Sequence, residues 1–224
     1  MQDYPSIAIA FITGFLSGLL LSIPIGPVNL TIINEGARRG FRFGVLVGLG
    51  ASTMEIIYCS IAFTGFASFF MHGFVKAVME VFSFAFLIVL GTKFLLAQSV
   101  PHAGAVEQRL EKRFHPHSAY MTGFLRVLGN PGVLIFWIIL SANFVSRDWV
   151  PPQLDTKTAC IAGVALGTNL WFCCISHAVS RGHKKFSEQT LLRMERGSGL
   201  GLLILGLIHG CQLVWQLTRA RHQI

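Results

Sequence analysis

A proline- and glycine-containing break interrupts the first apolar segment of the chain, the run at 19–33. Pro24, Gly26 and Pro27 stand where a helix would otherwise continue. Proline lacks the backbone N–H and clashes with the preceding turn, so the break leaves backbone groups without helical partners. In hydrocarbon each such group costs several kcal/mol unless protein or water satisfies it. The sequence therefore predicts a broken membrane helix that lines a polar cavity.

The composition is that of a membrane protein. Apolar residues make up 53% of the chain, charged residues make up 12%, and the mean hydropathy is +0.61. A soluble domain carries about 25% charged residues. The N-terminal residues lack lysine and arginine and the first apolar segment shows no small-residue cleavage site, so we expect a retained first span rather than a signal peptide. The five cysteines all fall in apolar segments, which favours buried small hydrophobic residues.

Six apolar segments are about 20 residues long or longer, the length that crosses the hydrocarbon core. They lie at 6–33 (broken), 43–66, 78–97, 120–143, 158–178 and 198–218. We therefore expect an all-α integral membrane fold with six transmembrane helices in a single transmembrane domain over 1–224. Its halves would cover about 1–97 and 119–224. Between them, 98–118 would form a cytoplasmic loop with a short surface helix at 106–114.

The lysine and arginine residues are distributed unevenly between the two sides of these predicted spans. Thirteen of the 18 lie on the side of the membrane at which spans one, three and five end, and five lie on the opposite side. Cytoplasmic loops carry an excess of these residues, so both termini are predicted to lie outside. The formal charge of +8 then reflects loops and does not indicate nucleic-acid binding.

The two predicted halves share a weak sequence repeat. Gly14-Phe15-Leu16 precedes the first break, and Gly123-Phe124-Leu125 precedes a second candidate break at 129–132, which contains Pro131. With three spans in each half, the second half would enter the membrane from the opposite side. The sequence thus predicts a 3+3 inverted-topology repeat with broken helices 1 and 4, an arrangement that places substrate sites centrally.

Glu55 is the clearest candidate functional residue. It lies in the middle of the second predicted span, with Ser52 and Tyr58 three residues to either side. An ionisable residue within a span costs about 2.5–3.5 kcal/mol on insertion scales, so it is a functional candidate by default. Out of water a carboxyl favours its neutral form, so Glu55 could exchange a proton, or it could hold a cationic substrate group. The alternative is a packing strut that is hydrogen-bonded to neighbouring helices.

Uncharged polar residues gather at the two breaks and in the fifth predicted span. They are Asn29, Thr31 and Asn34 after the first break, Asn130 at the second, and Thr168 and Asn169 beside Trp171. Each could instead hold helices together, at about 0.6 kcal/mol per interhelical hydrogen bond. Their joint placement predicts that they form a substrate or proton site together with Glu55.

Small residues recur at every fourth position at the start of the second span. They are Gly36, Gly40, Gly44, Gly48 and Ser52, and similar pairs in the last span are Gly197 with Gly201 and Gly206 with Gly210. Such stripes let helices approach closely. We expect packing within the chain rather than a dimer face, although the sequence leaves a homo-oligomer open.

Enzyme signatures are absent from the sequence. It contains no HExxH, GxSxG or Walker A motif, and no GxGxxG that opens a strand-to-helix unit. We therefore expect a protein that is not an enzyme and that needs neither a cofactor nor a metal ion. Its expected partners are a small-molecule substrate, the lipid bilayer and protons as coupling ion.

Several of these motifs, in this order, resemble those of the LysE/RhtB family of amino-acid exporters. The similar segments are Pro24-Ile25-Gly26-Pro27 with Asn29, the glycine and arginine loop at 36–40, the acidic Glu55, the third-span segment at 86–95, and the fourth-span segment from Gly123 to Phe136. The resemblance implies a proton-coupled secondary exporter of amino acids or similar small metabolites. Two alternatives remain open, a transporter or channel for a small inorganic ion and a membrane interaction protein that transports nothing.

Overall fold

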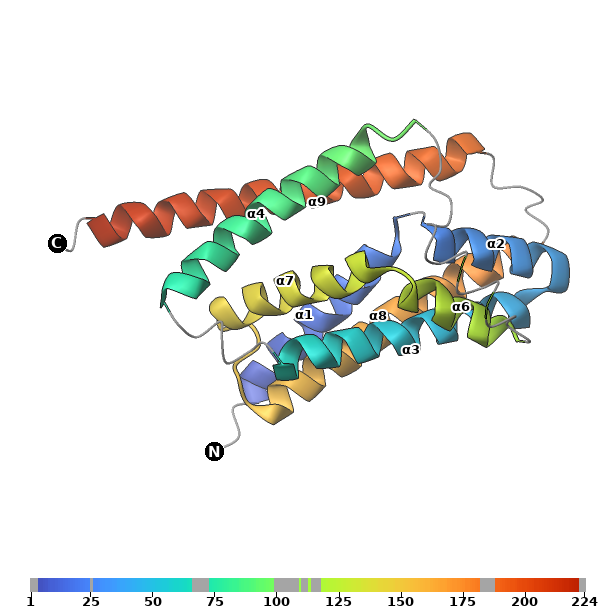
Figure 1. The fold of residues 1–224 in the computed structure, drawn as a ribbon, viewed down its shortest axis with the longest axis horizontal. Coiled ribbons are helices and arrows are strands. Elements are labelled where there is room, and N and C mark those ends of the chain that lie inside the picture. The colour runs from blue at the N-terminus through green and yellow to red at the C-terminus, as the bar shows by residue number, and fades with distance from the viewer. Residues whose placement is uncertain are drawn as a thin grey trace.

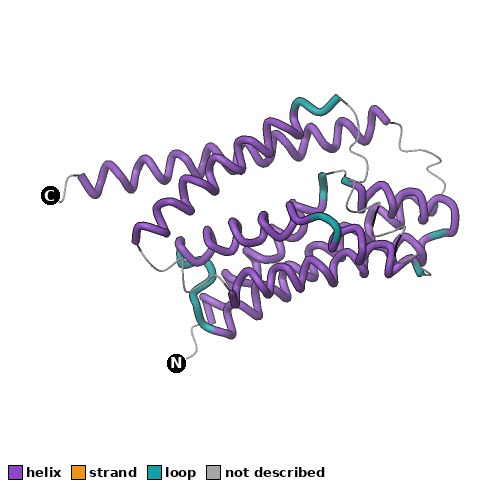
Figure 2. Tube along the Cα trace, viewed as in Figure 1, coloured by secondary structure: helices purple, strands orange, loops and turns teal. Residues whose placement is uncertain are grey.

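The structure is a computed structural model, and it describes residues 4–24, 26–65, 73–98, 109, 113, 118–181 and 188–221. Figure 1 shows the helices and Figure 2 shows that no strand occurs among these residues. The helices are α1 (Tyr4–Ser22), α2 (Pro27–Arg39), α3 (Phe41–Gly65), α4 (Gly73–Leu95), α6 (Ala119–Leu128), α7 (Pro131–Ser146), α8 (Leu154–Ser180) and α9 (Glu188–Arg221). Most of 98–118 lies outside the described residues, and of the expected surface helix at 106–114 the structure describes only Arg109 and Arg113.

Four of the six predicted spans correspond to helices, or to a bent helix pair, that are long and apolar enough to cross a membrane. Among the described residues, α1 over Pro5–Ser22, α3 and α8 are each long and apolar enough to span a bilayer. Helices α6 and α7 meet the same criterion together, although they are bent by 67° at the break between them. The all-helical membrane fold is confirmed. The count of six spans, which requires α4 and α9 as well, remains a prediction.

Both expected helix breaks are present, and proline starts the helix after each one. Pro27 is the first residue of α2, and Pro131 is the first residue of α7. Proline suits this position because the first amide of a helix has no intrahelical partner and the ring presets φ. At the second break Asn130 is the N-cap of α7, and its side-chain oxygen accepts a hydrogen bond from the Gly132 amide at 3.1 Å. Helix α2 ends at Gly40, whose φ of +94° favours glycine.

The first break lies where the sequence predicted it, and it follows a longer helix than the second break does. Helix α1 has 19 residues before the break, and its apolar part alone is long enough to cross a membrane. The break therefore follows a helix of full spanning length, and does not divide the first span in the middle. In the second pair, α6 has only 10 residues before the break, so there the bend does fall within the predicted span.

Three helix pairs make the most extensive contacts, α1 with α8, α3 with α6, and α4 with α9. In the first two pairs the backbones touch at glycines. A Cβ atom on Gly14 would overlap the backbone of Cys160, and one on Gly163 would overlap the Phe11 carbonyl. Likewise, a Cβ atom on Gly50 would overlap the backbone of Tyr120. Each of the three pairs joins one helix from the first half of the chain to one from the second half, so the two halves are interleaved.

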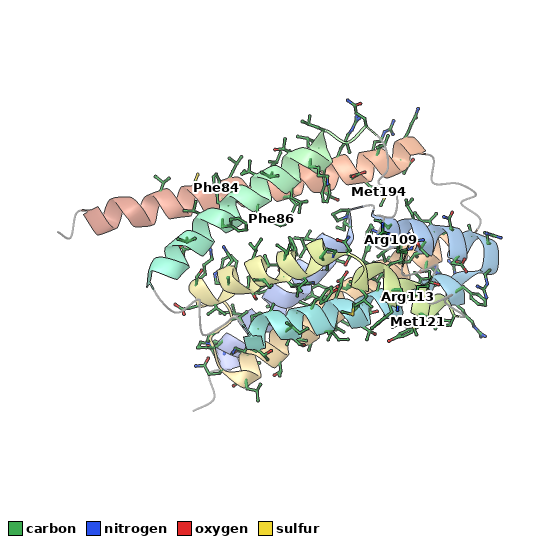
Figure 3. The ribbon with its side chains drawn as sticks, viewed as in Figure 1. Phe84, Phe86, Arg109, Arg113, Met121 and Met194 are labelled. Carbon is green, nitrogen blue, oxygen red and sulfur yellow. The ribbon has the colours of Figure 1, made fainter. Side chains whose placement is uncertain are left out.

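Helices α4 and α9 run side by side at one edge of the molecule (Figure 1). Glycines again permit the approach, since Gly210 faces the ring of Phe84. Helix α4 also contacts α7, and the Phe86 and Phe136 rings lie 5.7 Å apart at this contact. Figure 3 shows Phe84 on the side of α4 that faces α9, and Phe86 on the side that faces α7.

Most of the small residues predicted to permit close packing do pack within the chain. Gly44 and Gly48 face Ser176 and Phe172 of α8. Gly197 and Gly201 of α9 differ, because no residue that the structure describes lies within 4 Å of a Cβ atom placed on either one. The same is true of Gly40, where the backbone conformation rather than close packing requires glycine.

Candidate functional site

Glu55 meets Thr168 at the junction of three helices. The Thr168 hydroxyl on α8 lies 3.3 Å from the Glu55 carboxyl oxygen on α3 and 3.4 Å from the Gly18 carbonyl oxygen on α1. Thr168 is fully buried, and its single hydroxyl hydrogen can serve only one of these acceptors at a time. The hydroxyl can therefore donate either to the Glu55 carboxyl or to the Gly18 carbonyl, and a change in the protonation of Glu55 would alter this choice.

A second polar contact joins the same two helices one turn away. Asn169 donates from its amide nitrogen to the Ser52 hydroxyl oxygen at 2.8 Å and to the Ala165 carbonyl oxygen at 2.8 Å. Ser52 lies three residues before Glu55, so it points from the same face of α3. Helices α3 and α8 are thus linked by two side-chain hydrogen bonds.

Asn29 closes the first break. Its amide nitrogen donates to the carbonyl oxygen of Ser22 at 2.8 Å and to that of Pro24 at 2.7 Å. These are carbonyls that the end of α1 leaves without helical donors. The Asn29 side-chain oxygen accepts a hydrogen bond from the indole nitrogen of Trp171 on α8, at 3.3 Å. Protein groups therefore satisfy these two carbonyls of the break, and the same residue joins α2 to α8.

Tyr58 reaches the second break from α3. Its hydroxyl donates to the carbonyl oxygen of Leu128, the last residue of α6, at 3.0 Å. Tyr58 lies one helical turn beyond Glu55 on α3. At the other end of α6, away from the break, Tyr120 donates its hydroxyl to Thr53 at 3.0 Å. The second break is thereby connected to the helix that carries Glu55.

The structure brings together some of the predicted site residues and separates others. Glu55 with Thr168 and Asn29 with Trp171 are in direct contact, and Asn169 lies beside them on α8. Asn34 is exposed near the end of α2 and has no place among these contacts.

Two further predicted residues make only local bonds among the contacts described. Thr31 is buried, but its hydroxyl donates to the Pro27 carbonyl of its own helix. Asn130 accepts from Gly132 as the N-cap of α7. Pro24, Gly26, Pro27 and Pro131 all lie at the breaks, as expected.

Three groups that complete these contacts were not among the predicted site residues. Ser52 and Tyr58 stand at helical spacing from Glu55, and that spacing was the signal that could have added them to the site. The carbonyl of Gly18 carried no such signal, because a backbone acceptor depends on the crossing of α1 with α8. No group of three or more His, Cys, Asp or Glu side chains that could hold a metal ion occurs within the part of the chain that the structure describes.

Comparison with known proteins gives the family. The model of the LysE type translocator family matches residues 19–214, which include both breaks and every residue of the contacts above except Gly18. The chain belongs to the LysE type translocator family. This translocator is therefore a multi-pass membrane protein that functions in transport.

One relative of this LysE translocator covers nearly its whole length. The chain is 27% identical over 207 residues to a Bacillus subtilis (strain 168) protein named "Putative amino acid efflux protein YcgF". The match covers 92% of this chain and 98% of the relative. No solved structure matches the translocator significantly.

Proposed function

We propose that this LysE translocator is a secondary active exporter of amino acids in the bacterial inner membrane, coupled to protons through Glu55. The observation that carries the proposal is the contact of Glu55 with Thr168, because it places a carboxyl within a predicted span, beside the end of α1 and one turn from a residue bound to the second break. The name of the Bacillus subtilis relative supports amino acids as the substrate class.

The polar groups around Glu55 match the two ends of an amino acid. The carboxyl of Glu55 would hold either the coupling proton or the substrate ammonium group. The first turn of α2, which starts at Pro27, has backbone amides without intrahelical acceptors, and a helix N-terminus favours a carboxylate. Trp171 and Asn29 connect this turn to the helix of Thr168, so the two subsites would respond to each other.

Six spans in a 3+3 inverted repeat, with both termini outside, form the proposed architecture. The contacts at the helix crossings support the repeat. Gly163 of α8 meets Phe11 and Phe15 of α1, while Gly50 of α3 meets Tyr120 and Phe124 of α6. The two α6 residues each follow the corresponding α1 residue by 109 positions in the sequence. Gly163 follows Gly50 by 113 positions, the same interval that separates Thr168 from Glu55.

Other contacts follow the same rule. Gly14 of α1 meets Cys160 of α8, and Gly123 of α6 meets Val47 of α3. Gly123 follows Gly14 by 109 residues, and Cys160 follows Val47 by 113. Helix α1 begins and α9 ends toward the same end of the molecule in Figure 1, in keeping with termini on one side. The breaks themselves are less regular, because α1 is longer than α6.

Two pairs of helices would act as the moving units. Close glycine contacts tie α1 to α8 and α3 to α6, and backbones this close cannot slide apart without losing their packing. We propose that the α1–α8 pair rocks against the α3–α6 pair. The Glu55–Thr168 and Ser52–Asn169 contacts lie between these pairs, where a substrate would bind.

The experiment that tests this function is uptake into proteoliposomes that contain the purified protein. A panel of labelled amino acids would be offered outside, with the lumen either more acidic than the bath or at equal pH, and empty liposomes would serve as control. We expect at least one amino acid to accumulate in vesicles with an acidic lumen. If folded protein accumulates none of them, the amino-acid proposal fails and ion transport becomes the function to test.

A further inference from the structure

Two aromatic side chains each donate one hydrogen bond to a helix break. Tyr58 of α3 donates to the Leu128 carbonyl at the end of α6, at 3.0 Å. Trp171 of α8 donates to the Asn29 side chain at 3.3 Å, and Asn29 itself donates to the carbonyls at the end of α1. Each bond therefore holds a break of one half of the chain against a helix of the other half.

The two aromatic residues occupy corresponding positions. Thr168 follows Glu55 by 113 residues, and the same interval relates Trp171 to Tyr58. The crossing glycines Gly50 and Gly163 obey this interval as well. In the proposed inverted repeat, Tyr58 and Trp171 are thus one position represented twice.

The two residues also lie on opposite sides of the Glu55–Thr168 contact. Helices α3 and α8 are antiparallel, because Gly48 meets Phe172 whereas Glu55, further along α3, meets Thr168, which comes earlier in α8. Tyr58 and Trp171 each follow their contact residue by three positions, a rise of about 4.5 Å along the helix. Since the helices run in opposite directions, these displacements point to opposite sides of the membrane.

We propose that Tyr58 and Trp171 are a matched pair of gate residues, one on each side of the substrate site. The inference rests on the proposed function and its inverted repeat. When the Tyr58–Leu128 bond opens, the last residues of α6 would move away from α3 while the crossing of Gly50 on Tyr120 keeps the α3–α6 pair together, and the site would be exposed through the second break. When the Trp171–Asn29 bond opens, the site would be exposed through the first break. Both bonds closed would give an occluded state, which is the arrangement of this structure.

Each gate consists of a single neutral hydrogen bond, which is weak enough to open in every transport cycle. Loss of one bond should favour the state that is open on that side. Because the two open states compete, accessibility on the opposite side must then fall. This opposite change distinguishes a gate from a residue that merely stabilises its own neighbourhood.

The test measures how fast a cysteine at the first break reacts with a membrane-impermeant maleimide. Ser22→Cys would supply the reporter, in a protein whose five native cysteines are replaced by serine or alanine. It would be compared in the Tyr58→Phe, Trp171→Phe and doubly substituted proteins. Trp149→Phe is the matched control for Trp171→Phe, because it removes an indole outside both breaks. Tyr120→Phe is the control for Tyr58→Phe, because it removes a tyrosine hydroxyl that bonds Thr53 and neither break.

Trp171→Phe is expected to raise the labelling rate roughly three- to tenfold, the effect of losing one ordinary hydrogen bond. Tyr58→Phe should lower the rate by a similar factor, and the double variant should return near the starting value. Shifts in the same direction, or no shift in folded protein, would overturn the proposal, as would equal shifts in the controls. If the Ser22 reporter prevents folding, Val28→Cys at the start of α2 replaces it.

The labelling needs no substrate, so its failure can be told apart from a failure of the proposed function. A protein that transports no amino acid but shows opposite labelling shifts retains the gates and loses only the substrate class. A protein that transports amino acids without these shifts retains the function and loses the gates.

Discussion

The side chain of Asn29 donates to the carbonyl oxygen of Pro24 at 2.7 Å, so the residue that follows the first break also closes it. The same amide reaches Ser22, and its oxygen receives the indole of Trp171. A break in an apolar helix thereby keeps its carbonyls hydrogen-bonded while remaining tied to α8 by a single bond. That combination suits a segment that must open and close.

Asn29→Ala would leave the carbonyls of Ser22 and Pro24 without these donors. The Pro24 carbonyl keeps the Gly26 amide as a donor at 2.9 Å, so the Ser22 carbonyl is the acceptor left unsatisfied, and we expect the free energy of unfolding to fall by about 2 kcal/mol. Thermal unfolding in detergent would measure the change. Asn34→Ala, at an exposed position on the same helix, is the control and should alter stability by less than about 0.5 kcal/mol. Equal losses in the two variants would contradict the role of Asn29.

Gly50→Ala should separate α3 from α6, because the new methyl group would overlap the backbone of Tyr120. Overpacking of a rigid contact costs about 1–3 kcal/mol, and here the obstacle cannot rotate away. Gly201→Ala is the control, since it places a methyl group in open space within α9 and should stabilise the helix by about 0.5–1 kcal/mol. The comparison of melting temperatures checks both signs, and an unaffected Gly50→Ala protein would rule out the close crossing.

Exchanging Glu55 and Thr168 tests whether they occupy equivalent positions. The Glu55→Thr variant should lose transport, and adding Thr168→Glu should recover part of it, because the carboxyl returns to the same contact from the opposite helix. Thr168 is fully buried, and the double exchange conserves the combined volume of the two side chains. Amino-acid counterflow would be measured for both variants. If the double variant folds and is no more active than Glu55→Thr, the two positions are not equivalent.

The sequence was sufficient to predict the helical membrane fold and the positions of both breaks. Long apolar runs specify spanning helices because no other structure satisfies the backbone in lipid, and Pro27 and Pro131 can begin a helix but not continue one. The position of Glu55 was equally readable, because a carboxyl is conspicuous in an apolar run. These features depend on local chemistry alone.

The sequence could not predict which helices lie side by side. That arrangement depends on crossings such as Gly50 on Tyr120 and Gly163 on Phe11, between residues far apart in the chain. For this reason the Gly18 carbonyl near Thr168 and the bond from Tyr58 to Leu128 were not foreseen. Asn34 stays a prediction that the described contacts do not support, because its position on α2 leaves it exposed and apart from them.

The most direct test of the central claim is transport by Glu55→Gln protein in vesicles with an acidic lumen. Glu35→Gln is the matched control, because Glu35 forms an exposed ion pair with Arg39 at 3.0 Å, away from the site. Loss of pH-driven accumulation by about tenfold or more in Glu55→Gln alone is the predicted result. If Glu55→Gln protein accumulates the amino acid as wild type does, Glu55 neither carries the proton nor binds the substrate, and the account is wrong.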